Sequence, residues 1–71
     1  MNVFVYRTDI VTDLDLEGID EILSSHETIL RWNVDREDVD HVLRIESTAD
    51  NATELLQTVK GAGYFCEELT D

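Results

Sequence analysis

The sequence is short of cysteine, of positive charge and of long apolar runs. Its one cysteine, Cys66, cannot form a disulfide within the chain, so no disulfide framework indicates an oxidising compartment. Residues 1–7 lack the basic segment and the apolar run of a signal peptide. No apolar stretch approaches the ~20 residues of a membrane-spanning helix. These absences predict a cytoplasmic protein that does not contact membranes.

Positive charge is scarce. Five basic residues stand against 17 acidic ones, which gives a net charge of -12 at pH 7. Such a surface repels the phosphates of nucleic acids and of anionic membranes, so we expect neither as a partner. The charge is compatible with a cationic partner, with cation binding, or with solubility alone. Solubility is the simplest account, because net charge speaks to solubility rather than to mechanism.

The residue sets of common catalytic and metal sites are also missing. The sequence has no Ser/His/Asp or Cys/His arrangement, no phosphate-binding loop and no carboxylate pair in an apolar setting. We therefore expect no enzymatic activity and no cofactor. His26 and His41 are expected at the surface, since no His/Cys pair has the spacing of a metal site. Cys66 lies two residues after Tyr64, on the same face of the last predicted strand, and is expected in the core as a small hydrophobic residue.

What the sequence does contain is a regular succession of apolar patterns. Aromatic and β-branched residues alternate over residues 2–10, which predicts a strand. Apolar residues then recur at every third or fourth position to about Ser25, which predicts a helix. Two further strands are predicted at 26–35 and 42–46, joined by the polar segment 36–40.

The last third of the chain repeats the strand-helix-strand order. A second helix is predicted to begin after Asp50 or Asn51, and Asn51 with Glu54 has the form of a capping box. Glycines within residues 61–63 favour a left-handed helix stop. A short final strand is predicted at 64–69.

The order β-α-β-β-α-β predicts a ferredoxin-like fold of the α+β class, a sandwich of a four-stranded antiparallel sheet with both helices on one face. The first and third strands are expected at the centre of the sheet and the second and fourth at its edges. The face without helices would then carry a group of apolar residues. If they gather rather than scatter among charged neighbours, they mark a homodimer interface: Val3, Val5, Ile29, Val42 and Phe65.

The turn between the first strand and the first helix is rich in carboxylates. Thr12 and Asp15 have the spacing of a capping box. Acidic residues in the first turn of a helix are also favoured by its dipole, which accounts for Asp13, Asp15 and Glu17 without any ligand. The alternative is a site for a hard cation, built from Asp9, Asp13 and Asp15, which requires several oxygens to converge on one point.

Several short segments resemble a heavy-metal-associated (HMA) domain, the small fold of copper chaperones and of the N-terminal modules of metal-pumping ATPases. The resemblance covers nearly the whole chain, and its motifs are T-x-I at residues 8–10, W-x-V-D at 32–35, V-L-x-[IV] at 42–45 and A-G-Y at 62–64. Family members that bind soft metals do so with C-x-x-C at the first strand-to-helix turn. The flanking segments align Thr12 and Asp15 with these cysteines, and neither residue is a soft ligand.

The resemblance thus implies an HMA-like domain, residues 1–71, that has lost its thiolate metal site. We predict a non-catalytic binding or protein-interaction module with a protein partner that the sequence does not name. Two alternatives stay open. One is weak binding of a hard divalent cation by the carboxylates of the first strand-to-helix turn. The other is a ferredoxin-like regulatory domain that senses a small ligand.

Overall fold

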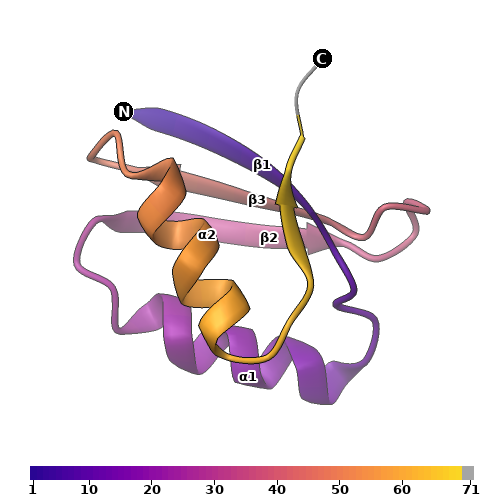
Figure 1. Ribbon diagram of the computed structural model, residues 1–71. Coiled ribbons are helices and arrows are strands. Elements are labelled where there is room, and N and C mark those ends of the chain that lie inside the picture. Colours follow the sequence, from indigo (N-terminus) through magenta and orange to yellow (C-terminus); the bar gives the residue numbers. More distant parts are fainter. Residues whose placement is uncertain (70–71) are drawn as a thin grey trace.

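Six elements form one antiparallel sheet covered by two helices. The computed structural model describes residues 1–69. The sheet order is β2-β3-β1-β4, and both helices pack on the same face of it (Figure 1). The predicted fold class is confirmed, with β1 and β3 at the centre. The elements are β1 (Asn2–Thr8), α1 (Asp13–Ser24), β2 (Ile29–Asp35), β3 (Val42–Ser47), α2 (Ala52–Gly61) and β4 (Cys66–Glu68).

β1 supplies the centre of the core because its alternate residues turn toward the helices. Tyr6 is completely buried, and its hydroxyl donates a hydrogen bond of 2.8 Å to the carbonyl of Ala52 at the start of α2. Burial raises the pKa of the Tyr6 phenol, so the group stays a neutral donor. The core around it is aliphatic apart from one thiol: Ile10, Ile19, Leu23, Leu43, Ile45, Leu55, Val59 and Cys66.

β2 contains an irregularity that the alternating pattern does not show. Ile29 pairs with Ser47 of β3, yet Arg31 pairs with the adjacent Glu46, so Leu30 is an extra residue in the ladder. The shift places Ile29 against the core, together with Trp32 and Val34. The assignment of Ile29 to the helix-free face was therefore wrong. A bulge reverses the side of every residue before it, and simple alternation cannot anticipate that.

The start of α2 differs from the predicted capping box. Asn51 is the residue before the helix, but its side chain accepts no hydrogen bond from the helix backbone. Its oxygen accepts instead from the hydroxyl of Ser47, at 3.0 Å, and its amide donates to Glu54, at 3.1 Å. The competing partner is the buried Ser47 at the end of β3, four residues earlier in the chain.

The end of α2 follows the prediction. Gly63 has a positive φ of 98° and its N–H donates to the carbonyl of Lys60, as a left-handed helix stop requires. Neither helix within residues 1–69 combines the length and apolar character needed to cross a membrane.

Gly18 lies where α1 meets the segment before β4. A Cβ placed on Gly18 would overlap the hydroxyl of Tyr64 and lie 3.5 Å from its Cζ atom, an ordinary contact. The Tyr64 ring packs against the core, so it is not free to move aside. This contact gives a physical reason for a glycine inside a helix, where alanine is usually preferred by about 1 kcal/mol.

We predict that Gly18→Ala destabilises the protein by about 1–3 kcal/mol, the usual cost of an overpacked contact. In a Tyr64→Phe background the hydroxyl is gone, so the same substitution should be neutral or stabilising through helix propensity. Urea unfolding of the four proteins of this double-mutant cycle measures the coupling. An equal loss in both backgrounds would contradict the contact.

Candidate functional site

The turn from β1 into α1 is closed by a reciprocal capping box, as predicted. The N–H of Asp15 donates to Thr12 Oγ1 at 3.1 Å, while Asp15 Oδ2 accepts from the N–H of Thr12 at 3.1 Å. The same oxygen accepts from the N–H of Val11 at 3.1 Å. Thr12 and Asp15, which the sequence resemblance predicts at the positions of the metal-binding cysteines, therefore bond to the backbone of the turn itself.

These bonds set the ionisation of Asp15. The backbone N–H of Thr12, then that of Val11, lowers the pKa of the Asp15 carboxyl below its ordinary value, because both stabilise the charged form. The group lies at the surface, so its negative charge remains exposed to solvent and salt.

The three carboxylates of the predicted cation site are held by separate partners. Asp13 forms an ion pair with Arg36, at 2.8 Å between Oδ1 and Nη1. Asp9 accepts a hydrogen bond of 3.0 Å from the N–H of Phe65, before β4. Asp15 is engaged within the capping box. Within residues 1–69, no group of three or more His, Cys, Asp or Glu side chains is arranged to hold a metal ion.

Cys66 lies in the core, as predicted. It pairs with Thr8 of β1 and is 3% exposed. Burial raises the pKa of its thiol to about 11. A thiol in this state carries almost no thiolate at neutral pH, and the thiolate is the form that binds soft metals.

The two histidines are not simple surface residues, contrary to the sequence prediction. The side chain of His26 is only 18% exposed, between α1 and the start of α2. His41 is partly buried at the end of the β2–β3 connection, with a positive φ of 47°. Its carbonyl accepts a hydrogen bond from the hydroxyl of Thr8.

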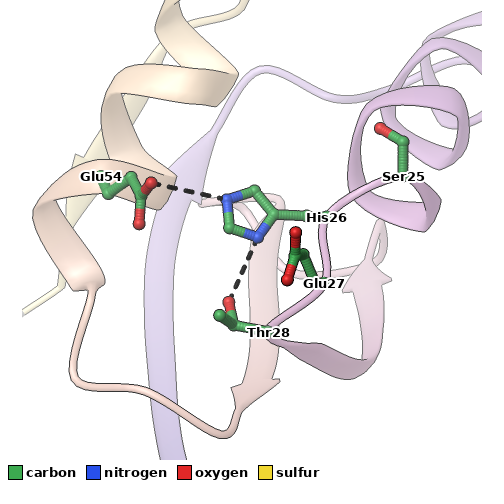
Figure 2. A pocket seen from close by; sticks show the side chains of 5 residues that line it. All are labelled: Ser25, His26, Glu27, Thr28 and Glu54. Carbon is green, nitrogen blue, oxygen red and sulfur yellow. Dashed lines mark hydrogen bonds and ion pairs between the residues drawn. The ribbon is translucent and has the colours of Figure 1, made fainter.

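A polar pocket surrounds His26, and sequence reasoning missed it. The pocket has a volume of about 310 Å³ and is lined by Ser25, His26, Glu27, Thr28 and Glu54 (Figure 2). His26 Nε2 lies 3.9 Å from Glu54 Oε1, and His26 Nδ1 lies 3.2 Å from Thr28 Oγ1. No local motif marks it, since His26 and Glu54 are far apart in the sequence and meet only through the packing of α1 beside α2.

The helix-free face of the sheet is the second notable surface. Val3 is 43% exposed and Phe65 is 48% exposed, while Val5 and Val42 are partly buried. Strand register places three arginines and three carboxylates among these residues: Arg7, Arg31, Arg44, Asp35, Glu46 and Glu67. Asp40, which pairs with Arg7, adds a fourth carboxylate. This surface, the outer sheet face, therefore has a net charge of only -1 in a chain whose total is -12, and its apolar residues are scattered among charged ones.

Comparison with solved structures shows which proteins share this arrangement. The apo form of the HMA domain of a copper chaperone for superoxide dismutase superposes with a TM-score of 0.81 over 96% of this chain. The chain has the fold of an HMA domain. Sequence identity is 12%, and the chain spans 66% of that protein's length. A protein from a study of crosstalk between Cu(I) and Zn(II) homeostasis also gives a TM-score of 0.81, at 11% identity, with 97% of this chain and 100% of that chain covered.

Sequence comparison adds nothing to this structural similarity. No protein-family model matches the chain, and no curated protein matches it. With identities this low, the structural similarity establishes the fold alone.

The capping box predicts that the free energy of unfolding depends on pH through the ionisation of Asp15. Its lowered pKa means that the carboxylate stabilises the fold fully above the ordinary carboxyl pKa, and this contribution is lost as pH falls toward the lowered folded-state pKa. We expect the stability difference between wild type and Asp15→Asn to be largest at neutral pH and to shrink between about pH 5 and pH 3.

Urea unfolding at a series of pH values measures this difference. Glu21→Gln removes one charge from the same helix without touching the turn, so it controls for general relief of repulsion. Parallel pH curves for wild type and Asp15→Asn would show that the capping box does not act as described.

Proposed function

We propose that this chain is a non-catalytic protein-interaction module on the HMA fold, in which the metal-loop positions serve as a helix cap. The observation that carries the proposal is the reciprocal bonding of Thr12 and Asp15 at 3.1 Å. Hydroxyl and carboxylate oxygens are poor ligands for Cu(I), and here both side chains bond to the turn's own backbone.

The remaining soft donor supports the same proposal. Cys66 would have to leave the core and lose a proton from a thiol with a raised pKa before it could bind a metal. Exposing a buried side chain costs hydrophobic free energy, and a single thiolate offers no chelation in return.

We propose that the outer sheet face binds a second copy of this chain. Two copies that each carry -12 repel one another over most of their surfaces. The outer sheet face opposes association less than the rest of the surface, because its three arginines nearly offset its four carboxylates. Its exposed Val3 and Phe65 stand singly among charged residues and add only a small apolar area that association would bury.

The alternation of positive and negative side chains on the outer sheet face also favours association with a second copy of the same face. Arg31 pairs with Glu46, and Arg7 pairs with Glu67 at 3.7 Å and with Asp40 at 3.2 Å. Two of the three arginines therefore lie beside a carboxylate on the same surface, and Arg44 forms no ion pair at 4.0 Å or less within residues 1–69. In a twofold dimer the same surface meets itself, so alternating charges of this kind can exchange partners across the interface.

The loss of soft-metal binding is tested by titrating Cu(I) anaerobically, and Zn(II), against a competing chelator. We expect that neither wild type nor Cys66→Ala competes. The matched gain-of-function variant is Thr12→Cys/Asp15→Cys, which places two thiols at the start of α1 and should compete for both ions. Tight binding by wild type that Cys66→Ala abolishes would overturn the proposal and make Cys66 a ligand.

The self-association is tested by sedimentation equilibrium up to high protein concentration. We expect dimers that strengthen as ionic strength rises from about 0.01 M to 0.15 M, because the screening length falls from about 30 Å to about 8 Å. Arg44→Glu should weaken the dimer by about tenfold or more, since it places like charges in the contact.

Lys60→Glu provides the control for this measurement. It makes the same change in net charge at the end of α2, away from the outer sheet face, and should weaken association far less. A monomer at high concentration and moderate salt would contradict the proposed dimer. Equal effects of Arg44→Glu and Lys60→Glu on the dissociation constant would contradict it as well.

A further inference from the structure

The pocket at His26 is formed by segments that are distant in the sequence. Ser25 and His26 follow the end of α1, Glu27 and Thr28 lead into β2, and Glu54 lies in the first turn of α2 (Figure 2). The loop is tied to the rest of the fold by its backbone, since the carbonyl of Thr28 accepts from the N–H of Thr48 at 2.8 Å.

A chain of hydrogen bonds from the core fixes the polar groups of the pocket. The buried Ser47 hydroxyl donates to Asn51 Oδ1 at 3.0 Å. The amide of Asn51 then donates to Thr28 Oγ1 at 2.9 Å and to Glu54 Oε2 at 3.1 Å. The partly buried Asn51 therefore holds side chains on two sides of the pocket, so these polar groups are positioned before any ligand arrives.

The bonding directions leave mainly hydrogen-bond acceptors for a ligand. Thr28 Oγ1 accepts from the amide of Asn51, and the same oxygen lies 3.2 Å from His26 Nδ1. The 3.9 Å from Nε2 to Glu54 Oε1 is too long for a direct hydrogen bond, so that oxygen keeps accepting capacity. Ser25 Oγ donates to the carbonyl of Ile22 and likewise remains an acceptor.

The electrostatics of the pocket favour positive charge. Glu27 and Glu54 line it, and no lysine or arginine does. α1 ends at the pocket with no basic residue in its last turn, so the negative end of its dipole is not compensated by the helix itself. Within residues 1–69, Glu27 forms no ion pair at 4.0 Å or less.

We propose that this pocket binds a cationic hydrogen-bond donor on a short aliphatic stem, an alkylguanidinium or alkylammonium group. Such a group supplies the N–H donors that the two carboxylates and the hydroxyls lack. A volume of about 310 Å³ accommodates a group of side-chain size. The group belongs either to a free small molecule or to an arginine or lysine side chain. The residues of this pocket take no part in the outer sheet face, which lies on the opposite side of the sheet from the helices.

The binding is measured by titrating the protein at pH 8 and constant ionic strength while recording two-dimensional amide NMR spectra. The probes are propylguanidinium, propylammonium, a blocked peptide with one central arginine, and tetramethylammonium, a cation without N–H donors. We expect saturable shifts confined to residues 25–28 and the first turn of α2 for the donor cations, and none of comparable size for tetramethylammonium. Binding of propylguanidinium without the peptide indicates a free ligand, and binding of both indicates that a partner's side chain also fits.

Paired variants decide whether the pocket is responsible. Glu27→Gln and Glu54→Gln should each lower the affinity for the donor cations by about three- to fivefold, as expected for exposed ion pairs. The control is Glu17→Gln/Glu21→Gln, which removes two charges from the surface of α1 outside the pocket. It should lower the cation affinity less than Glu27→Gln/Glu54→Gln does. Equal effects of these two double variants, or equal shifts with tetramethylammonium, would overturn the proposal. Sedimentation of Glu27→Gln/Glu54→Gln reports separately on the dimer.

Discussion

The need to accommodate 17 carboxylates around a small core shapes this protein. Within residues 1–69, four of them stabilise turns by accepting backbone N–H groups. Asp15 accepts from Val11 and Thr12, and Asp9 ties the turn after β1 to Phe65 before β4. Asp35 and Asp38 do the same in the β2–β3 connection. The acidic residues are therefore part of the local architecture, and the loops depend on their charged form.

The sequence predicted what depends on local spacing. The alternation in β1, the apolar stripes of both helices and the Thr12–Asp15 capping box all involve residues close in the chain, and all are present. The errors arose where a distant or irregular contact decided the outcome. The extra residue in β2 moved Ile29 to the core, and buried Ser47 captured the oxygen with which Asn51 was expected to cap α2. The His26 pocket left no sequence signal for the same reason.

The shared fold at about one-eighth sequence identity shows that very different sequences form this architecture. The copper-chaperone HMA domain and this chain superpose over 96% of its length, so the sheet and helices do not require a C-x-x-C turn. The capping box gives a physical reason, because it satisfies the N–H groups that begin α1 without any ligand. A strand-to-helix turn must satisfy these donors in any sequence, and a Thr/Asp pair does so from within the chain.

The two proposed surfaces are linked through charge even though they do not touch. Self-association through the outer sheet face is opposed by the repulsion between two chains of -12 each. Each cation bound between Glu27 and Glu54 reduces that repulsion, so it should strengthen the dimer. By linkage, dimerisation must then raise the affinity of the pocket for cations by the same factor. This coupling needs no conformational change, because it follows from placing a cation-accepting pocket and a nearly neutral contact face on one strongly acidic domain.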